Sequence, residues 1–263
     1  MKASNQAEFT ISAFSLLLAI ILVHGAYVAV IRPQANDFIK HEKELMEADP
    51  NHKSESSPYV ILRDYEQEAC FVLMIWAMAI LGFKMRRANG QRRYLETDFI
   101  GEVEGNRITT QAAARIAQRI RSQKGLQSLL LPDVLATTLE RFHTTKKIEA
   151  ASTESLNLCA EEAERLESEL SMIRYIAWAI PSVGFIGTVR GIGDALSQAH
   201  KAREGDITGI TTSLGMAFNS TFIALLISIV LMFVVHQVQL TQERLVLKTQ
   251  RYCKKWVVGR LVV

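Results

Sequence analysis

The chain has 263 residues, of which 49% are hydrophobic and 22% charged, and its formal net charge at pH 7 is +3. So small a net charge gives no reason to expect a nucleic-acid partner. The apolar residues gather in a few long runs separated by charged segments, which predicts membrane-spanning helices. Three widely spaced cysteines, Cys70, Cys159 and Cys253, indicate neither a disulfide framework nor a metal site.

The first apolar run covers residues 9–31 and, at ~1.5 Å per residue, extends about 34 Å, enough to cross the hydrocarbon core. It is too long for the apolar part of a cleaved signal peptide, and only Lys2 precedes it with a positive charge. We therefore expect residues 1–31 to hold the N-terminus and an uncleaved first transmembrane helix. Residues 32–68 are acidic on balance and are expected to form an extracytoplasmic loop of unknown role.

The second run, residues 69–83, is followed by "KMRRANGQRR", and residues 69–84 are predicted to form the second transmembrane helix. Residues 85–171 are expected to form a helical cytoplasmic domain, since "TTQAAARIAQRIRSQ" and "LCAEEAERLESELSMIRYIAWAI" have helical periodicity. The second of these stretches leads directly into the third apolar run, which predicts one long helix. Pro132 marks a break between helices. Charges on this domain form either a solvated face or a docking surface for a cytoplasmic partner.

The third and fourth runs, residues 173–196 and 214–235, predict a transmembrane hairpin over residues 172–236, and residues 237–263 a C-terminal helix. Lysines and arginines follow the second and fourth runs. By the positive-inside rule, both termini and the segment before the hairpin lie in the cytoplasm. The predicted fold class is therefore all-α, a polytopic membrane protein with four transmembrane helices and a helical cytoplasmic domain.

Two threonines of this hairpin are predicted to lie at the same depth. Thr188 lies ~12 Å below the outer end of the third run, and Thr221 ~13.5 Å below the outer end of the fourth. Ser220 and Asn219 are close to Thr221 in sequence. Either hydroxyl could simply bond a carbonyl one turn back on its own helix. The shared depth favours a polar position on an ion pathway.

Small residues line one side of the third run. Gly184, Gly187 and Gly191 share a face there and indicate close packing against another helix. Arg190 and Asp194 are four positions apart near the outer surface and are expected to form an ion pair, with a role in ion entry as the alternative. The string "GTVRGIG" lacks the Gly-Lys-Ser/Thr ending of a phosphate loop and follows no strand, so nucleotide binding is not indicated.

No aspartate or glutamate is expected at mid-depth in any span, and His24 is the only ionisable residue there. A proton or sodium pathway normally needs a carboxylate. If ions cross this protein, the carboxylate that binds them is expected to come from another chain.

The segments "IPSVGFIGTVRGI" and "GMAFNSTFIALLIS" resemble the MotA/TolQ/ExbB family of ion-driven motor subunits. Pro181 and the three glycines fall in the family pattern Pro-x-x-Gly-x-x-Gly-Thr-Val-x-Gly, and Thr221 falls on the threonine of the last span. The order of segments is similar to the MotA branch, which has four spans. Two features depart from the pattern. Met216 replaces an acidic residue of ExbB-like members, and the last span lacks a later proline.

The resemblance implies a homopentamer around a dimer of a single-span partner of the MotB/TolR/ExbD kind, which carries a membrane aspartate. It implies a bacterial inner-membrane location, transport of protons more readily than sodium ions, and no cofactor or metal. Thr188 and Thr221 would line the pore, and Pro181 would couple ion passage to movement.

Two other functions remain as alternatives. A non-conducting scaffold or signalling subunit could keep the same hairpin for assembly alone. An enzyme finds little support, because no catalytic constellation or nucleotide loop is visible. The work that a motor would perform stays open among flagellar-type rotation, outer-membrane energisation, gliding and phage defence of the Zorya kind.

Overall fold

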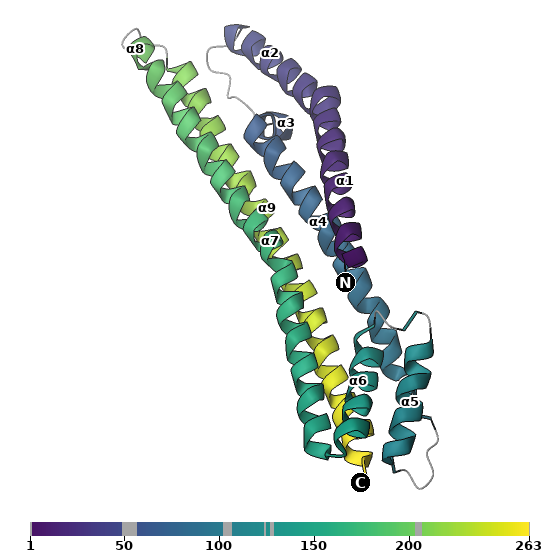
Figure 1. Cartoon of the computed structure of the whole chain (residues 1–263). Coiled ribbons are helices and arrows are strands. Elements are labelled where there is room, and N and C mark those ends of the chain that lie inside the picture. Colours follow the sequence, from purple (N-terminus) through teal and green to yellow (C-terminus); the bar gives the residue numbers. More distant parts are fainter. Residues whose placement is uncertain are drawn as a thin grey trace. The chain divides into compact units, whose positions relative to one another are not determined.

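The computed structural model describes residues 2–48, 57–101, 107–123, 125–126, 129–202 and 207–262. Within these ranges the chain is helical and contains no strand (Figure 1). An isolated parallel bridge joins Ile108 to Leu261. The predicted all-α fold is confirmed.

The long helices follow one another along the chain with short helical turns between them. They are α1 (Lys2–Ala26), α2 (Arg32–Ala48), α4 (Tyr65–Arg92), α5 (Thr110–Ser122), α6 (Leu130–Thr145), α7 (Ile148–Ser197) and α9 (Thr208–Tyr252). The short elements are the π-helix η1 (Tyr27–Ile31), α3 (Pro58–Ile61), η2 (Arg93–Glu96), α8 (Ala199–Ala202), η4 (Cys253–Val257) and η5 (Val258–Arg260).

Among the described residues, four helical stretches are long and apolar enough to cross a membrane. They lie within Thr10–Met46, Tyr65–Glu96, Ile148–Ser197 and Thr208–Arg260. Large apolar side chains on them face outward, such as Phe14, Trp178 and Phe233. Exposed apolar surface of this extent is typical of lipid-facing or partner-facing helices. The chain is thus a multi-pass membrane protein.

Residues 32–48 form a helix where the sequence predicted a loop. Helix α2 continues α1 through the π-helix η1. Pro33 has no backbone N–H, and its ring would clash with the carbonyl four residues earlier, at Ala29. Ala29 lies within η1, where the wider π-turn accommodates the proline without ending the helix.

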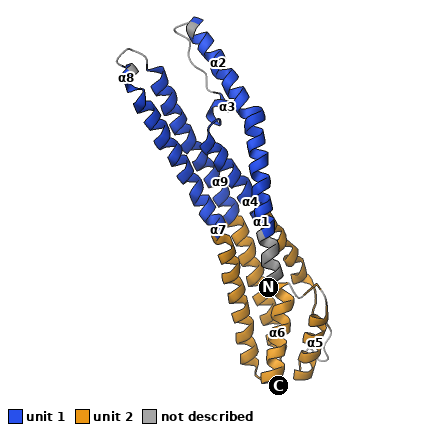
Figure 2. Cartoon of the chain, turned by 45° about the horizontal axis from the view of Figure 1, so that its top comes forward, with its two compact units in different colours: residues 1–81, 172–235 blue, residues 82–171, 236–263 orange. Residues whose placement is uncertain are grey.

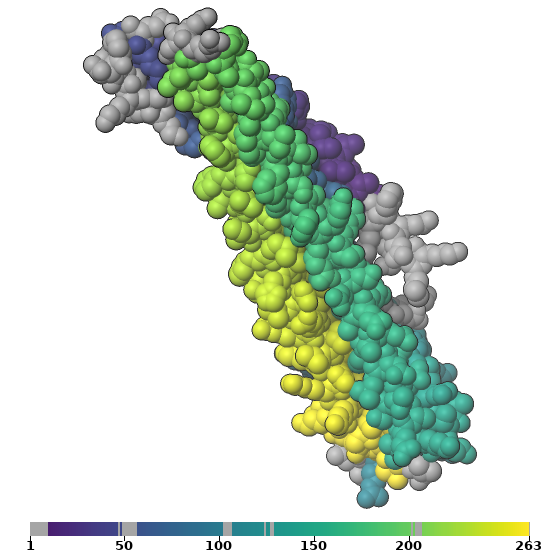
Figure 3. All heavy atoms as spheres, turned by 90° about the vertical axis from the view of Figure 1, so that its left-hand side faces the viewer, coloured from purple at the N-terminus to yellow at the C-terminus, as the bar shows by residue number. Residues whose placement is uncertain are grey.

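The chain divides into two compact units, shown in different colours in Figure 2. Unit 1 comprises residues 1–81 and 172–235, and unit 2 comprises residues 82–171 and 236–263. Helices α4, α7 and α9 contribute residues to both. As predicted, α7 is one uninterrupted helix of 50 residues that includes Pro181. Figure 3 shows α7 and α9 side by side.

Unit 2 has its own hydrophobic core beneath the antiparallel pair α5 and α6. Leu135, Leu139 and Phe142 of α6 are fully buried in it. Helix α5 starts where the Thr109 hydroxyl accepts a hydrogen bond from the Ala112 N–H, which caps the helix. Residues near the C-terminus pack against the segment before α5, where the Ile108 N–H donates to the Arg260 carbonyl at 2.7 Å.

Candidate functional site in the α7–α9 hairpin

The three glycines of α7 pack against three small residues of α9. A Cβ on Gly184 would lie 2.5 Å from the Ala224 Cβ, and one on Gly187 would lie 2.7 Å from the Ser220 Cβ. At Gly191 the corresponding distance, to the Ala217 Cβ, is also 2.7 Å. The helix that the small-residue face was expected to meet is therefore α9 of the same chain. Such contact lets the two backbones approach closely.

This close approach brings the hydroxyls of Thr188 and Thr221 into contact across the hairpin. The Thr188 hydroxyl also lies 3.1 Å from the carbonyl oxygen of Ala217, on the opposite helix. The Thr221 hydroxyl lies 3.1 Å from the carbonyl oxygen of Gly184. Each hydroxyl therefore reaches a carbonyl of the other helix, and Thr188 also reaches its own helix at Gly184, 3.3 Å away. These contacts exclude the alternative that each hydroxyl bonds only to a carbonyl of its own helix.

Two hydroxyls carry two protons, while the surrounding oxygens offer more acceptor positions than two protons can fill. The hydrogen bonds can therefore be exchanged by rotating the hydroxyls. Neither hydroxyl ionises near neutral pH, so the pair can pass or coordinate an ion but cannot balance its charge. In the described hairpin no carboxylate hydrogen-bonds to either threonine.

The neighbouring polar residues do not all join this pair. Ser220 is 2% exposed and lies against Gly187, one residue before Thr188. Asn219 is half-buried, and no side-chain hydrogen bond connects it to the other polar residues of the described hairpin.

A second polar contact lies two turns away on both helices. Pro181 cannot donate a backbone hydrogen bond, so it leaves the carbonyl of Ala177 without its usual helical partner. The Ser228 hydroxyl of α9 donates to this carbonyl at 2.9 Å. Pro181 precedes Thr188 by seven residues, and Ser228 follows Thr221 by seven, as antiparallel pairing requires. That spacing is the signal in the sequence that could have identified Ser228.

Arg190 pairs with a residue that the sequence had placed in a loop. Its guanidinium Nε lies 2.8 Å from Glu66 Oε1, and its Nη2 donates to Glu66 Oε2 at 2.8 Å. The expected partner, Asp194, is exposed, and its backbone carbonyl accepts from Ser197 and Gln198. Glu66 lies in the first turn of α4, and its Cγ would lie 3.3 Å from a Cβ on Gly187. A carboxylate of the same chain thus contacts the hairpin one residue from Thr188.

A second carboxylate of the same helical turn connects α4 to α1 and α2. Glu68 Oε1 lies 2.7 Å from His24 Nδ1, and Glu68 Oε2 accepts a hydrogen bond from Arg32. The guanidinium of Arg32 also lies over the ring of Tyr65, 4.2 Å from its centroid. His24 therefore belongs to an ion-paired cluster. Both glutamates already have cationic partners.

The described residues contain no group of histidine, cysteine or acidic side chains that could hold a metal ion. The three cysteines are buried, free thiols. The Cys70 thiol lies 3.6 Å from the carbonyl oxygen of Ile180, beside the proline of α7.

These features define a multi-pass helical membrane protein whose close-packed hairpin carries a paired polar position. The sequence model of the MotA/TolQ/ExbB proton channel family matches residues 117–251, about half of the chain, and includes this hairpin. The chain belongs to that family, which consists of channel proteins and not enzymes. No curated protein and no solved structure matches the chain.

Proposed function

We propose that this protein is the channel-forming subunit of an ion-driven motor of the bacterial inner membrane. Five copies surround a dimer of a single-span partner of the MotB/TolR/ExbD kind, and both termini lie in the cytoplasm. The contact between Thr188 and Thr221 carries this proposal. It puts two exchangeable hydroxyls at one depth inside a tightly packed hairpin.

The need for a partner follows from charge. Ion transfer requires a carboxylate that can gain and lose its ion. Glu66 is held by Arg190, and Glu68 by Arg32 and His24, so these carboxylates are already neutralised within the chain. The ion-binding carboxylate then comes from the partner. We propose that the transported ion is a proton and that no cofactor takes part.

The exposed faces of the hairpin support assembly. Val189 and Leu196 of α7 are 72% and 70% exposed, and Phe218 of α9 is 64% exposed. Together with Phe185, Phe222 and Phe233 they form apolar faces that one chain leaves uncovered. Neighbouring copies, the partner and lipid would cover them.

Native mass spectrometry of the protein co-expressed with a single-span, aspartate-bearing partner tests the assembly. We expect a complex of five and two chains. A monomer or dimer would contradict the motor. A pentamer that takes up no partner would favour a scaffold built on the same hairpin.

A further inference from the structure

Unit 2 contains a basic pocket between the end of α4 and the end of α9. It has a volume of about 560 Å³. Its lining contains five cationic side chains and one carboxylate, that of Glu96. The five cations are Arg92, Arg93, Lys248, Arg251 and Lys255. Nothing in the ion pathway uses these residues.

The positive charge of this pocket is not neutralised by the described part of the chain. Within those ranges, no carboxylate lies at ion-pair distance from Arg92, Lys248 or Arg251. Other cations of unit 2 do have such partners, as Lys84 has Glu169 at 2.7 Å. Like charges held close together repel one another, and a bound anion would offset that repulsion.

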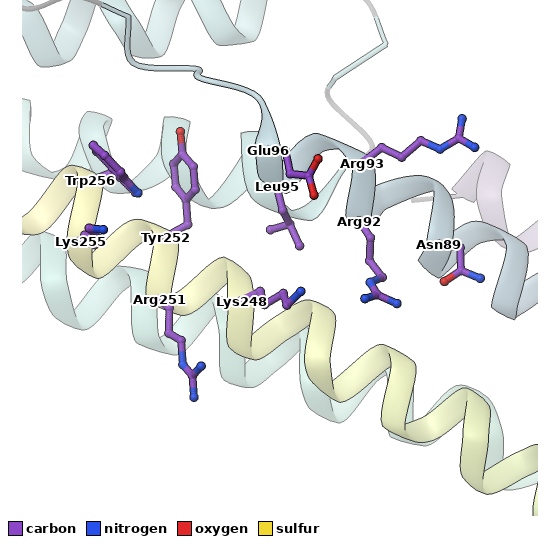
Figure 4. A pocket seen from close by; sticks show the side chains of 10 residues that line it. All are labelled: Asn89, Arg92, Arg93, Leu95, Glu96, Lys248, Arg251, Tyr252, Lys255 and Trp256. Atoms are coloured by element: carbon purple, nitrogen blue, oxygen red, sulfur yellow. The ribbon is translucent and has the colours of Figure 1, made fainter.

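The arrangement of the side chains suits an anion of moderate size. Figure 4 shows Arg92 and Lys248 extending into the space between α4 and α9, while Arg93 extends outward. The wall is fixed in part by the Tyr252 hydroxyl, which donates to the Thr97 carbonyl at 3.3 Å. Next to it the Trp256 ring holds the guanidinium of Arg260, 4.4 Å from its centroid. Guanidinium and ammonium groups together are the usual protein ligands of phosphate.

We propose that this pocket binds the phosphate group of an anionic ligand, at a site separate from the ion pathway. A soluble phosphate compound and a lipid headgroup would lie at different distances from the hydrocarbon core of the membrane. Arg92 lies nine residues beyond Phe83, the last residue of the second apolar run, or ~13.5 Å along the helix. The headgroup layer adds only about 5 to 8 Å on each side of the hydrocarbon core. This distance favours a soluble phosphate compound over a lipid headgroup.

The test uses the full chain purified in neutral detergent, with inorganic tripolyphosphate as the soluble probe in titration calorimetry. We expect binding that the double variant R92Q/K248Q weakens at least tenfold. The variant R115Q removes an exposed arginine of α5 elsewhere in unit 2 and should bind as the wild type does. Since exposed charges are screened by salt, affinity should fall several-fold between low and moderate ionic strength.

A second arm compares nanodiscs of phosphatidylglycerol with nanodiscs of phosphatidylcholine, and measures retention of each lipid by native mass spectrometry. Retention of phosphatidylglycerol that is lost in R92Q/K248Q, without tripolyphosphate binding, would identify a lipid headgroup as the source of the phosphate. The proposal is overturned if the wild type binds neither probe. It is equally overturned if R92Q/K248Q and R115Q bind with equal affinity, because the anion would then be attracted by the overall positive charge of the protein and not by this pocket.

Discussion

Arg190 of α7 and Glu66 of α4 lie 124 residues apart in sequence and form an ion pair in which two guanidinium nitrogens contact the two carboxylate oxygens. The two side chains differ in environment, since Glu66 is 12% exposed and Arg190 is 45% exposed. The pair fixes the start of α4 against the hairpin beside Gly187. It neutralises a carboxylate that would otherwise lie close to the threonine pair.

The difference in exposure predicts unequal effects of breaking this pair. R190Q leaves a nearly buried carboxylate unpaired and should lower the free energy of unfolding by about 2 kcal/mol. E66Q leaves an arginine that can still reach water and should cost less than about 1 kcal/mol. Denaturation of the purified protein in mixed micelles measures both, and the double variant should recover most of the loss. Equal losses for the two single variants would contradict this assignment.

The threonine pair predicts a loss of ion flux without a loss of assembly. T188V and T221V keep the side-chain shape but remove the hydroxyl, and each should reduce proton flux in proteoliposomes containing the partner by about tenfold or more. T221S keeps the hydroxyl and should retain most of the flux. Native mass spectrometry of the same variants serves as the control for assembly. Undiminished flux in T188V/T221V would show that the two hydroxyls do not lie on the ion pathway, whereas a wild-type complex without flux would favour the non-conducting scaffold.

The glycine contacts predict a position-specific cost for a single methyl group. G184A places a Cβ within 2.5 Å of the Ala224 Cβ and should destabilise the hairpin by about 2 kcal/mol. A second change, A224G, removes the clashing atom and should restore most of that stability. G193A is the matched control on the same helix, because nothing lies within 4 Å of its Cβ. We expect G193A to unfold at the wild-type denaturant concentration or above it.

Pro181 and Ser228 predict a compensating pair of substitutions. S228A leaves the Ala177 carbonyl without its side-chain donor and should cost about 1 kcal/mol. P181A supplies a backbone N–H for that carbonyl, so S228A should have little further effect on stability in a P181A background. A thermal unfolding series on the four variants measures this coupling. Additive losses would show that the Ser228 hydroxyl does not act on the carbonyl that the proline frees.

Asp64 predicts a pH dependence of stability in unit 1. Burial, opposed in part by the charge of Arg63, raises the pKa of Asp64 above its ordinary value of 3.8. The folded state therefore keeps a proton that the unfolded state has already lost, so stability falls as pH rises from 3.8 through the raised pKa. D64N should remove this dependence and make the protein more stable than the wild type at pH 7. Denaturation curves at pH 4 and pH 7 provide the comparison.

Much of the fold follows from local pattern. The four apolar runs, the continuity of α7 and the helical character of unit 2 all depend on composition and period, which a single sequence carries. The common depth of Thr188 and Thr221 could be obtained by counting residues, because helical rise is constant. Their contact across the hairpin required, in addition, that the glycine face of α7 meet α9.

The remaining features depend on which helices become neighbours. Asp194 was a reasonable partner for Arg190 at a spacing of four, but Glu66 offers both carboxylate oxygens from a different helix. Residues 32–48 are rich in charged helix formers, whereas the prediction of a loop over residues 32–68 rests on their acidity alone. The expectation that no carboxylate lies at mid-depth rests on the apolar runs alone. Glu66 lies before the second run begins and contacts the hairpin from the side, so the composition of those runs does not reveal it.

The hydrogen bond from Ser228 to the Ala177 carbonyl has a mechanical consequence for α7. A backbone hydrogen bond inside a helix breaks only when the helix unwinds, whereas this one breaks when a single side chain rotates about its Cα–Cβ bond. The rotamer of a serine on the neighbouring helix therefore decides whether this carbonyl of α7 has a donor. This point lies two turns from the hydroxyls of Thr188 and Thr221.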